Sequence, residues 1–161
     1  MTMKKMRTLC GLVCLLLCVA LCACSNGSST SGKTVDVKAA MEEIKGTYEF
    51  SDVNDVTDNM LMSVYGIDQK NVKSYAGLTD ASGIQATDIM LVEANDSDAA
   101  EAVRAALQAR LDNRKSQMKD YLPDVYATLE KSKVSVSGNY VALICDENQD
   151  KILSLYESCF K

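Results

Sequence analysis

The sequence predicts an α+β domain. Its centre is one antiparallel four-stranded sheet, made of two hairpins that flank a long helix, with the helices packed on one face. Two observations predict the sheet: short β-favouring runs occur in two pairs, and a turn separates the members of each pair. A third predicts the helices, because apolar stripes with helical spacing lie before, between and after the pairs. The expected order is α-α-β-β-α-α-β-β-α.

The domain is expected to begin with two helices. The first has an apolar stripe whose members recur every three or four residues: Val37, Met41, Ile44 and Tyr48. The second covers residues 57–65, and Gly66 follows as a C-terminal stop signal.

The first hairpin is predicted over residues 72–80 and 86–94. Residues 89–92 are continuously apolar, which indicates a central strand or one buried on both faces. A long helix follows to about residue 119, and Asp98 with Glu101 resembles a capping box at its start. The buried stripe of this helix is expected to be Val103, Leu107, Leu111 and Met118. Its solvent side is expected to be Arg104, Arg110, Arg114 and Lys115.

The C-terminal part has the clearest pattern. Pro123, the only proline, suits the first turn of a helix over residues 123–131. Residues 133–137 and 140–145 then form the second predicted hairpin, with Gly138-Asn139 as a type II′ turn. A final helix is expected over residues 147–160.

The N-terminus has the pattern of a secretory signal. Residues 1–7 carry three basic residues and no acid, and an apolar run of about 15 residues follows. This run is shorter than the roughly 20 residues that span a membrane. It ends in Leu21-Cys22-Ala23-Cys24, which resembles the lipobox of bacterial lipoproteins. The resemblance implies lipidation at Cys24, and the lipid would anchor the protein to the outer face of the cell membrane.

This pattern divides the chain into three parts: a signal peptide at residues 1–23, a Gly/Ser/Thr-rich flexible tether at 24–34, and one α+β domain at 35–161. Without residues 1–23, 14 Lys and Arg face 22 Asp and Glu, a formal charge of −8. Such a surface argues against nucleic acid as a partner.

Most of the seven cysteines belong to the N-terminus. Four lie in the predicted signal peptide, and Cys24 is the predicted lipidation site. Cys145 and Cys159 remain. The sequence leaves two alternatives for them, a disulfide outside the cell or two buried free thiols.

Residues 27–34 match the phosphate-loop pattern G-x-x-x-x-G-K-[ST]. Such a loop needs a buried strand before it, and here only the predicted tether precedes it. We therefore expect a linker at this position, and no nucleotide.

The sequence contains no histidine, which excludes Ser-His-Asp and Cys-His catalytic groups from it. No cofactor or metal is predicted. Three acidic clusters suit either Ca²⁺ binding or the capping of helix starts, and capping is favoured. They are Asp52, Asp55 and Asp58; Asp96, Asp98 and Glu101; and Asp146, Glu147 and Asp150.

Tyrosine is the dominant aromatic residue, with seven Tyr against two Phe and no Trp. Tyr65, Tyr75 and Tyr140 are candidates for a ligand or partner surface. The alternative is that they complete a small core.

Three segments carry a resemblance to a known family: residues 62–68 followed by 72–75, residues 86–94, and residues 137–141. In this order they look like Gram-positive lipoproteins that carry a domain of unknown function, over about residues 53–160. The resemblance implies a lipid-anchored cell-surface protein and supplies no catalytic residues.

These observations together predict a non-catalytic binding or accessory module of the cell envelope. Its partner would be an unknown envelope protein or a small ligand. One alternative is an envelope hydrolase that uses carboxylates. A second is a small-solute-binding lipoprotein.

Overall fold

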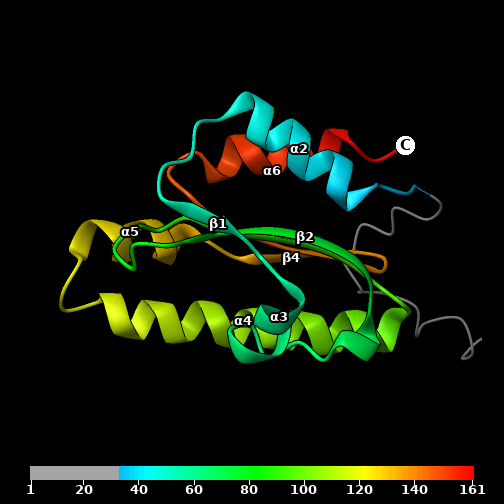
Figure 1. Ribbon diagram of the computed structural model, residues 1–161, viewed down its shortest axis with the longest axis horizontal. Helices are drawn as coiled ribbons and strands as arrows, with labels where there is room; N and C mark the ends of the chain where they lie inside the picture. Colours follow the sequence, from blue (N-terminus) through cyan, green and yellow to red (C-terminus); the bar gives the residue numbers. More distant parts are fainter. Residues whose placement is uncertain (1–32) are drawn as a thin grey trace, which may run out of the picture.

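The computed structural model describes residues 33–161 (Figure 1). The predicted signal peptide, the predicted lipidation site Cys24, most of the predicted tether and most of the phosphate-loop-like segment lie outside these residues. None of the helices described within 33–161 is long and apolar enough to cross a membrane.

The described chain is α+β, as predicted, and its single sheet is antiparallel throughout. The prediction of four strands was wrong, because the sheet has five, in the order β1-β2-β3-β5-β4. The strands are β1 (Val53–Asp55), β2 (Val72–Asp80), β3 (Asp88–Ala94), β4 (Val134–Ser137) and β5 (Tyr140–Cys145). Both hairpins lie where the sequence predicts them, and β3 pairs with β5 to join them into one sheet.

The unpredicted strand, β1, is three residues long and contains one apolar residue, so it has no strand pattern of its own. It forms because β2 offers a free edge, with Val53 opposite Asp80. Gly77 of β2 makes the close packing there feasible. A Cβ at this position would lie 2.7 Å from Val56 Cγ2 and 2.8 Å from Met90 Sδ.

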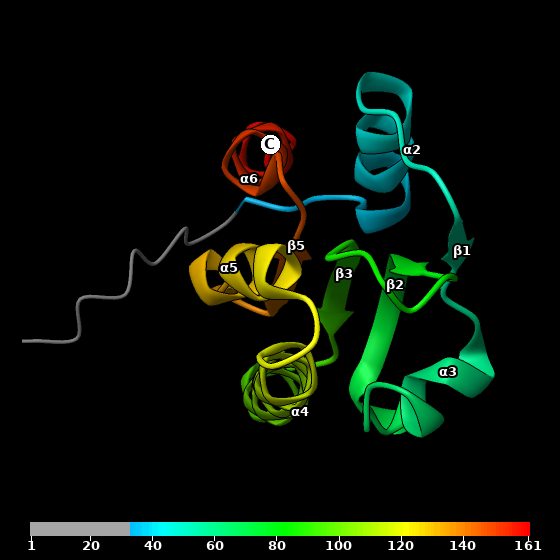
Figure 2. The ribbon, with the colours of Figure 1, turned by 90° about the vertical axis from the view of Figure 1, so that its left-hand side faces the viewer.

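Helices cover both faces of the sheet, so the prediction of helices on one face was wrong (Figure 2). The reason is that β5 is buried along its whole length and β3 at all but one residue, so both faces of these strands need cover. Helices α2 and α6 share one core with the sheet, and α3, α4 and α5 share the other. The helices are α2 (Val37–Thr47), α3 (Asp58–Ser63), α4 (Ser97–Met118), α5 (Pro123–Lys131) and α6 (Gln149–Ser158), with a 3₁₀ turn at Gln69–Asn71.

Local signals begin and end these elements. Asp36 caps α2, since its side chain accepts hydrogen bonds from two backbone N–H groups. Asp96 caps α4 through the N–H of Ala99, at 2.8 Å, so the capping box predicted at Asp98 lies two residues too far along the chain. Gly138 has φ +59° in the β4–β5 turn, which suits the predicted type II′ geometry.

The two ends of the described chain meet. The N–H of Thr34 donates to the carbonyl of Lys161, and the N–H of Lys161 donates to that of Thr34, both at 3.0 Å. This pair holds the start of the domain beside its C-terminus, at one end of the long axis (Figure 1).

Candidate functional site

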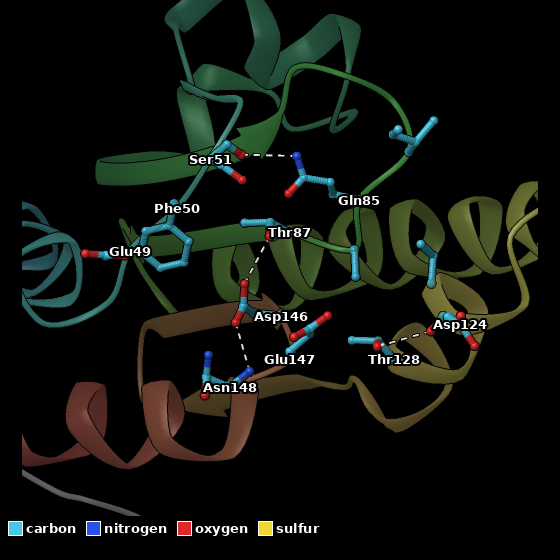
Figure 3. A pocket seen from close by; sticks show the side chains of 13 residues that line it. Glu49, Phe50, Ser51, Gln85, Thr87, Asp124, Thr128, Asp146, Glu147 and Asn148 are labelled. Carbon is cyan, nitrogen blue, oxygen red and sulfur yellow. Dashed lines mark hydrogen bonds between the residues drawn. The ribbon is translucent and has the colours of Figure 1, made fainter.

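A cleft of about 370 Å³ lies at the opposite end of the long axis from Thr34 and Lys161. We call it the end cleft (Figure 3). Four segments that are far apart in sequence form its walls, and each is a connection or a helix start: residues 49–51, 84–87, 124–128 and 146–148. The sheet brings them together, because β3 begins and β5 ends at this edge.

Asp146 lies deep in the end cleft, directly after β5, and is 8 % exposed. Its two carboxylate oxygens accept hydrogen bonds from neutral donors, the Thr87 hydroxyl at 3.0 Å and the Asn148 backbone N–H at 2.8 Å (Figure 3). The second bond forms a turn just before α6, whose N-cap residue is Asn148, and the helix itself has no side-chain cap.

Hydrogen bonds hold the wall formed by residues 84–87 in place. The Gln85 side chain donates to the Ser51 carbonyl at 3.2 Å, which ties two walls together (Figure 3). Arg114 reaches from α4 and donates to the carbonyls of Gln85 and Ala86, at 2.6 and 2.9 Å. The Arg114 guanidinium therefore fixes the position of the backbone of residues 85–86 in this wall.

The end cleft is acidic at its rim and partly apolar on its walls. Glu49, Asp124 and Glu147 are exposed, and no lysine or arginine is among the lining residues. Within residues 33–161 none of these acids, nor Asp146, has a cationic side chain within ion-pair distance. The apolar surface comes from Phe50, Val125 and Ile84, and Ile84 is 63 % exposed.

A wider hollow of about 660 Å³ adjoins the end cleft and shares Glu49, Phe50 and Ser51 with it. It is more open, and it contains Lys45, whose ammonium group pairs with Glu42 and Asp55. The end cleft is therefore the more enclosed of the two, and it has no cationic side chain in its lining, whereas the wider hollow has Lys45.

A second buried carboxylate, Asp88, lies close to the end cleft and is fully compensated. Its Oδ1 accepts a hydrogen bond from the Tyr65 hydroxyl at 2.6 Å. Its Oδ2 pairs with Arg110 Nε at 3.0 Å and with Arg114 Nη1 at 3.3 Å. The Arg110 guanidinium also lies over the Tyr65 ring, 5.4 Å from the centroid.

Burial and this carboxylate change the acidity of neighbouring groups. Burial, and then the negative charge of Asp88, raise the pKa of Tyr65 above its ordinary value. The same two causes raise the pKa of Cys145, which faces Asp88 across the β3–β5 pair, to about 12. Both groups are therefore neutral at physiological pH.

The three candidate tyrosines do not form one surface. Tyr65 is 2 % exposed and belongs to the core on the α4 face, so its assignment to a ligand or partner surface is corrected. Tyr75 packs against the same core and donates to Asp58 at 2.5 Å. Tyr140 is 8 % exposed, belongs to the opposite core, and donates to Glu93 at 3.2 Å. The alternative, a role in completing the core, describes Tyr65 and Tyr140, whereas Tyr75 is partly buried at the edge of the core and lines a surface hollow.

Cys145 and Cys159 are both free thiols, so the structure excludes the disulfide as an alternative for this state of the chain. Cys145 belongs to the core beneath α4, while Cys159 packs against the core on the other face of the sheet. The sheet itself separates the two sulfurs.

The sequence pointed to part of the end cleft only. Asp146 and Glu147 belong to a predicted acidic cluster, but Glu49 and Asp124 come from other segments. Arg110 and Arg114 were expected on the solvent side of their helix, yet Arg114 is 5 % exposed and both pair with Asp88. A polar start to a strongly apolar strand, Thr87-Asp88, was the available signal. Among residues 33–161 no three acidic or cysteine side chains converge as metal ligands would.

Residues 46–146 match a protein family described as a domain of unknown function, DUF4358. The chain belongs to this family. The DUF4358 match includes all five strands, α3 to α5 and the deep residue Asp146 of the end cleft, whereas Glu147 and α6 follow it. It confirms the resemblance to a family with a domain of unknown function. No curated protein and no solved structure matches the chain significantly.

Proposed function

We propose that this DUF4358 protein is a lipid-anchored, non-catalytic binding protein on the outer face of the cytoplasmic membrane of a Gram-positive bacterium. The end cleft would be its binding site, for an envelope protein or a small ligand. Neither nucleic acid nor a nucleotide is expected there, because the rim acids would repel phosphate.

One observation carries this proposal: the end cleft and the N-terminal attachment point lie at opposite ends of the domain. Thr34 and Lys33 are near the start of β5, and Asp146 directly follows its end. At roughly 3.4 Å per residue, six residues of β5 separate the two ends by about 17 Å or more. A chain anchored through Cys24 would present the end cleft away from the membrane.

The binding role is favoured over catalysis by the contacts of the acids. Both carboxylate oxygens of Asp146 are engaged by neutral donors, the Thr87 hydroxyl and the Asn148 backbone N–H, and within the described chain no second acid lies within hydrogen-bond distance of it to share a proton. The sequence also has no histidine to serve as a general base near neutral pH. A carboxylate-dependent hydrolase remains the alternative, and it would show an activity that Asp146→Asn and Glu147→Gln abolish.

Anchoring is tested by mass spectrometry and fractionation of cells that express the full chain. We expect a diacylglyceryl group on Cys24, and we expect Cys24→Ser to move the protein out of the membrane fraction. Cys22→Ser is the matched control, since Leu21 before it is too large for the cleavage position, and it should leave the protein anchored. An unmodified Cys24 would contradict the proposal.

Use of the end cleft is tested by photo-crosslinking in intact cells. A photoreactive p-benzoylphenylalanine replaces Ile84 at the cleft mouth or, as a control, Met62 on α3, which is 59 % exposed. A specific adduct at position 84 and none at position 62 is the expected result. Equal labelling at both positions, or none at 84, would count against a binding role for the end cleft.

A further inference from the structure

Asp146 is a buried carboxylate without a counter-ion. It is 8 % exposed and points into the end cleft, and its hydrogen-bond donors, Thr87 and Asn148, are neutral. A carboxylate in such a position gains from a nearby cation more than an exposed carboxylate does, because less water screens the pair. Asp88, which is fully buried at the same edge of the sheet, has two arginines as counter-ions. A cation beside Asp146 would supply what the described part of the chain does not.

The surroundings of Asp146 favour a positive ligand with an apolar stem. Glu49, Asp124 and Glu147 add negative charge around the mouth. Phe50 and Val125 provide apolar wall, which contributes nothing to a bare metal ion but packs against methylene groups. A volume of about 370 Å³ also exceeds what a single ion fills and is sufficient for a side chain.

The oxygens of Asp146 can still accept a donor from a cationic ligand, and an ammonium group makes the smallest geometric demand on them. A guanidinium binds a carboxylate best through both oxygens at once. Here each oxygen already accepts one hydrogen bond, from Thr87 or from Asn148, so a guanidinium would have to align with the remaining lone pair of both oxygens at once. An ammonium group needs only one remaining lone pair, because it acts as a compact charge with donors in three directions.

We propose that the end cleft binds a primary ammonium group on an aliphatic stem, as in the lysine side chain of an envelope partner, and that Asp146 supplies its counter-charge. This inference rests on the proposed function in one respect, that the end cleft is the binding site. The stem lies against Phe50 and Val125, and the rim acids steer the cation inward.

The test is an NMR titration of the ¹⁵N-labelled full-length chain in a non-ionic detergent. The probes are Nα-acetyl-lysine amide and Nα-acetyl-norleucine amide, which differ in the charged amino group. We expect saturable shifts of the amides at residues 85–87, 124–128 and 146–148 with the lysine probe. The norleucine probe should bind more weakly by about tenfold or more.

Two variants with the same charge change make the test specific. Asp146→Asn should weaken the binding of the lysine probe by about tenfold or more. Asp98→Asn removes an equally negative but exposed acid from the first turn of α4, and it should leave the affinity unchanged. Melting temperatures of both variants near that of the parent chain would show that the fold is intact. A double variant of the rim acids, Glu147→Gln with Asp124→Asn, should weaken binding of the lysine probe less than Asp146→Asn does.

Equal binding of the two probes would overturn the inference, and so would unchanged binding by Asp146→Asn. No saturable shift, or a response confined to added CaCl₂, would overturn it as well. If the probe fails while the photo-adduct at position 84 persists, the proposed function stands without an ammonium ligand. If both fail, the end cleft is not a binding site.

Discussion

Asp88 and Asp146 are two buried carboxylates at the same edge of the sheet, and their surroundings differ in one respect. Asp88 has two arginines and a tyrosine hydroxyl around it, so its charge is balanced within the fold. Asp146 has a threonine hydroxyl and a backbone N–H, so its charge is solvated by dipoles but not balanced. Asp88 lies in the interior beneath α4, from which both arginines come. Asp146 lies in the wall of the end cleft.

The difference separates a stabilising role from a binding role. A paired buried charge depends on both partners, and the loss of one partner leaves the other charge uncompensated. A buried negative charge without an internal counter-ion can instead be paired by a cation of a bound ligand. We therefore expect substitutions around Asp88 to act on stability, and substitutions of Asp146 to act on binding.

The largest effect is expected from Arg114→Met. The variant keeps an unbranched apolar stem but leaves Asp88 short of a cation, and it removes the hydrogen bonds to Gln85 and Ala86. We expect the free energy of unfolding, measured with urea, to fall by about 3–5 kcal/mol. Arg104→Met, on the same helix but in the exposed pair with Glu101, should lower it by less than about 1 kcal/mol. If both variants lost the same unfolding free energy, the buried pair at Asp88 would be no more important for stability than an exposed pair, and the contrast with Asp146 would fail.

High pH provides the second test, through Cys145. Burial and then Asp88 raise the pKa of this thiol to about 12 in the folded chain, from an ordinary value near 9. Between these values the unfolded chain releases a proton that the folded chain retains. Stability is therefore full below about pH 9 and decreases as pH rises toward 12. The unfolding free energy is measured from pH 8 to pH 11 in two variants. It should fall less steeply in Cys145→Ala, which lacks the buried thiol, than in Cys159→Ala, which keeps it and lacks only the partly buried one.

Asp146→Asn is expected to change stability little. The asparagine carbonyl accepts the N–H of Asn148, and its amide group donates to the Thr87 hydroxyl oxygen, so both contacts have a substitute. Removal of an unbalanced charge offsets part of any remaining loss. The unfolding free energy should stay within about 1 kcal/mol of the parent. A loss as large as that of Arg114→Met would assign Asp146 a structural role instead.

The smallest effect is expected at the mouth of the end cleft. Ile84 is 63 % exposed, so Ile84→Ser removes apolar surface that the fold does not bury. Its unfolding free energy should change by no more than about 0.5 kcal/mol. If the change were larger, the β2–β3 loop would be part of the structural core, and not a wall of the end cleft available to a ligand.

Sequence patterns located most of the fold because the elements follow local rules. Apolar periodicity and turn residues placed both hairpins, and Pro123 marked the start of α5. The strand β1 was missed because its pairing with β2 depends on tertiary contact, and not on any pattern in its three residues. The second layer of helices was missed although residues 89–92 signalled burial on both faces.

The candidate site was less predictable than the fold. Asp146 is expected to cap a helix start, but it lies two residues before the N-cap of α6 and holds the turn that leads into the helix. Arg110 and Arg114 were expected in solvent because charged residues on a helix usually are. Helical spacing cannot reveal that a buried acid on a neighbouring strand, Asp88, lies opposite them.

The amino-acid sequence by itself determined the helices, the two hairpins, the net negative charge and the N-terminal signal pattern, because each depends on neighbours a few residues apart. Only the tertiary structure decided which acids are balanced and which are not, that Cys145 and Cys159 lie on opposite faces, and that four distant segments form the end cleft. The physical reason is that burial and electrostatic compensation depend on distance in space, and the pairing of β3 with β5 sets those distances.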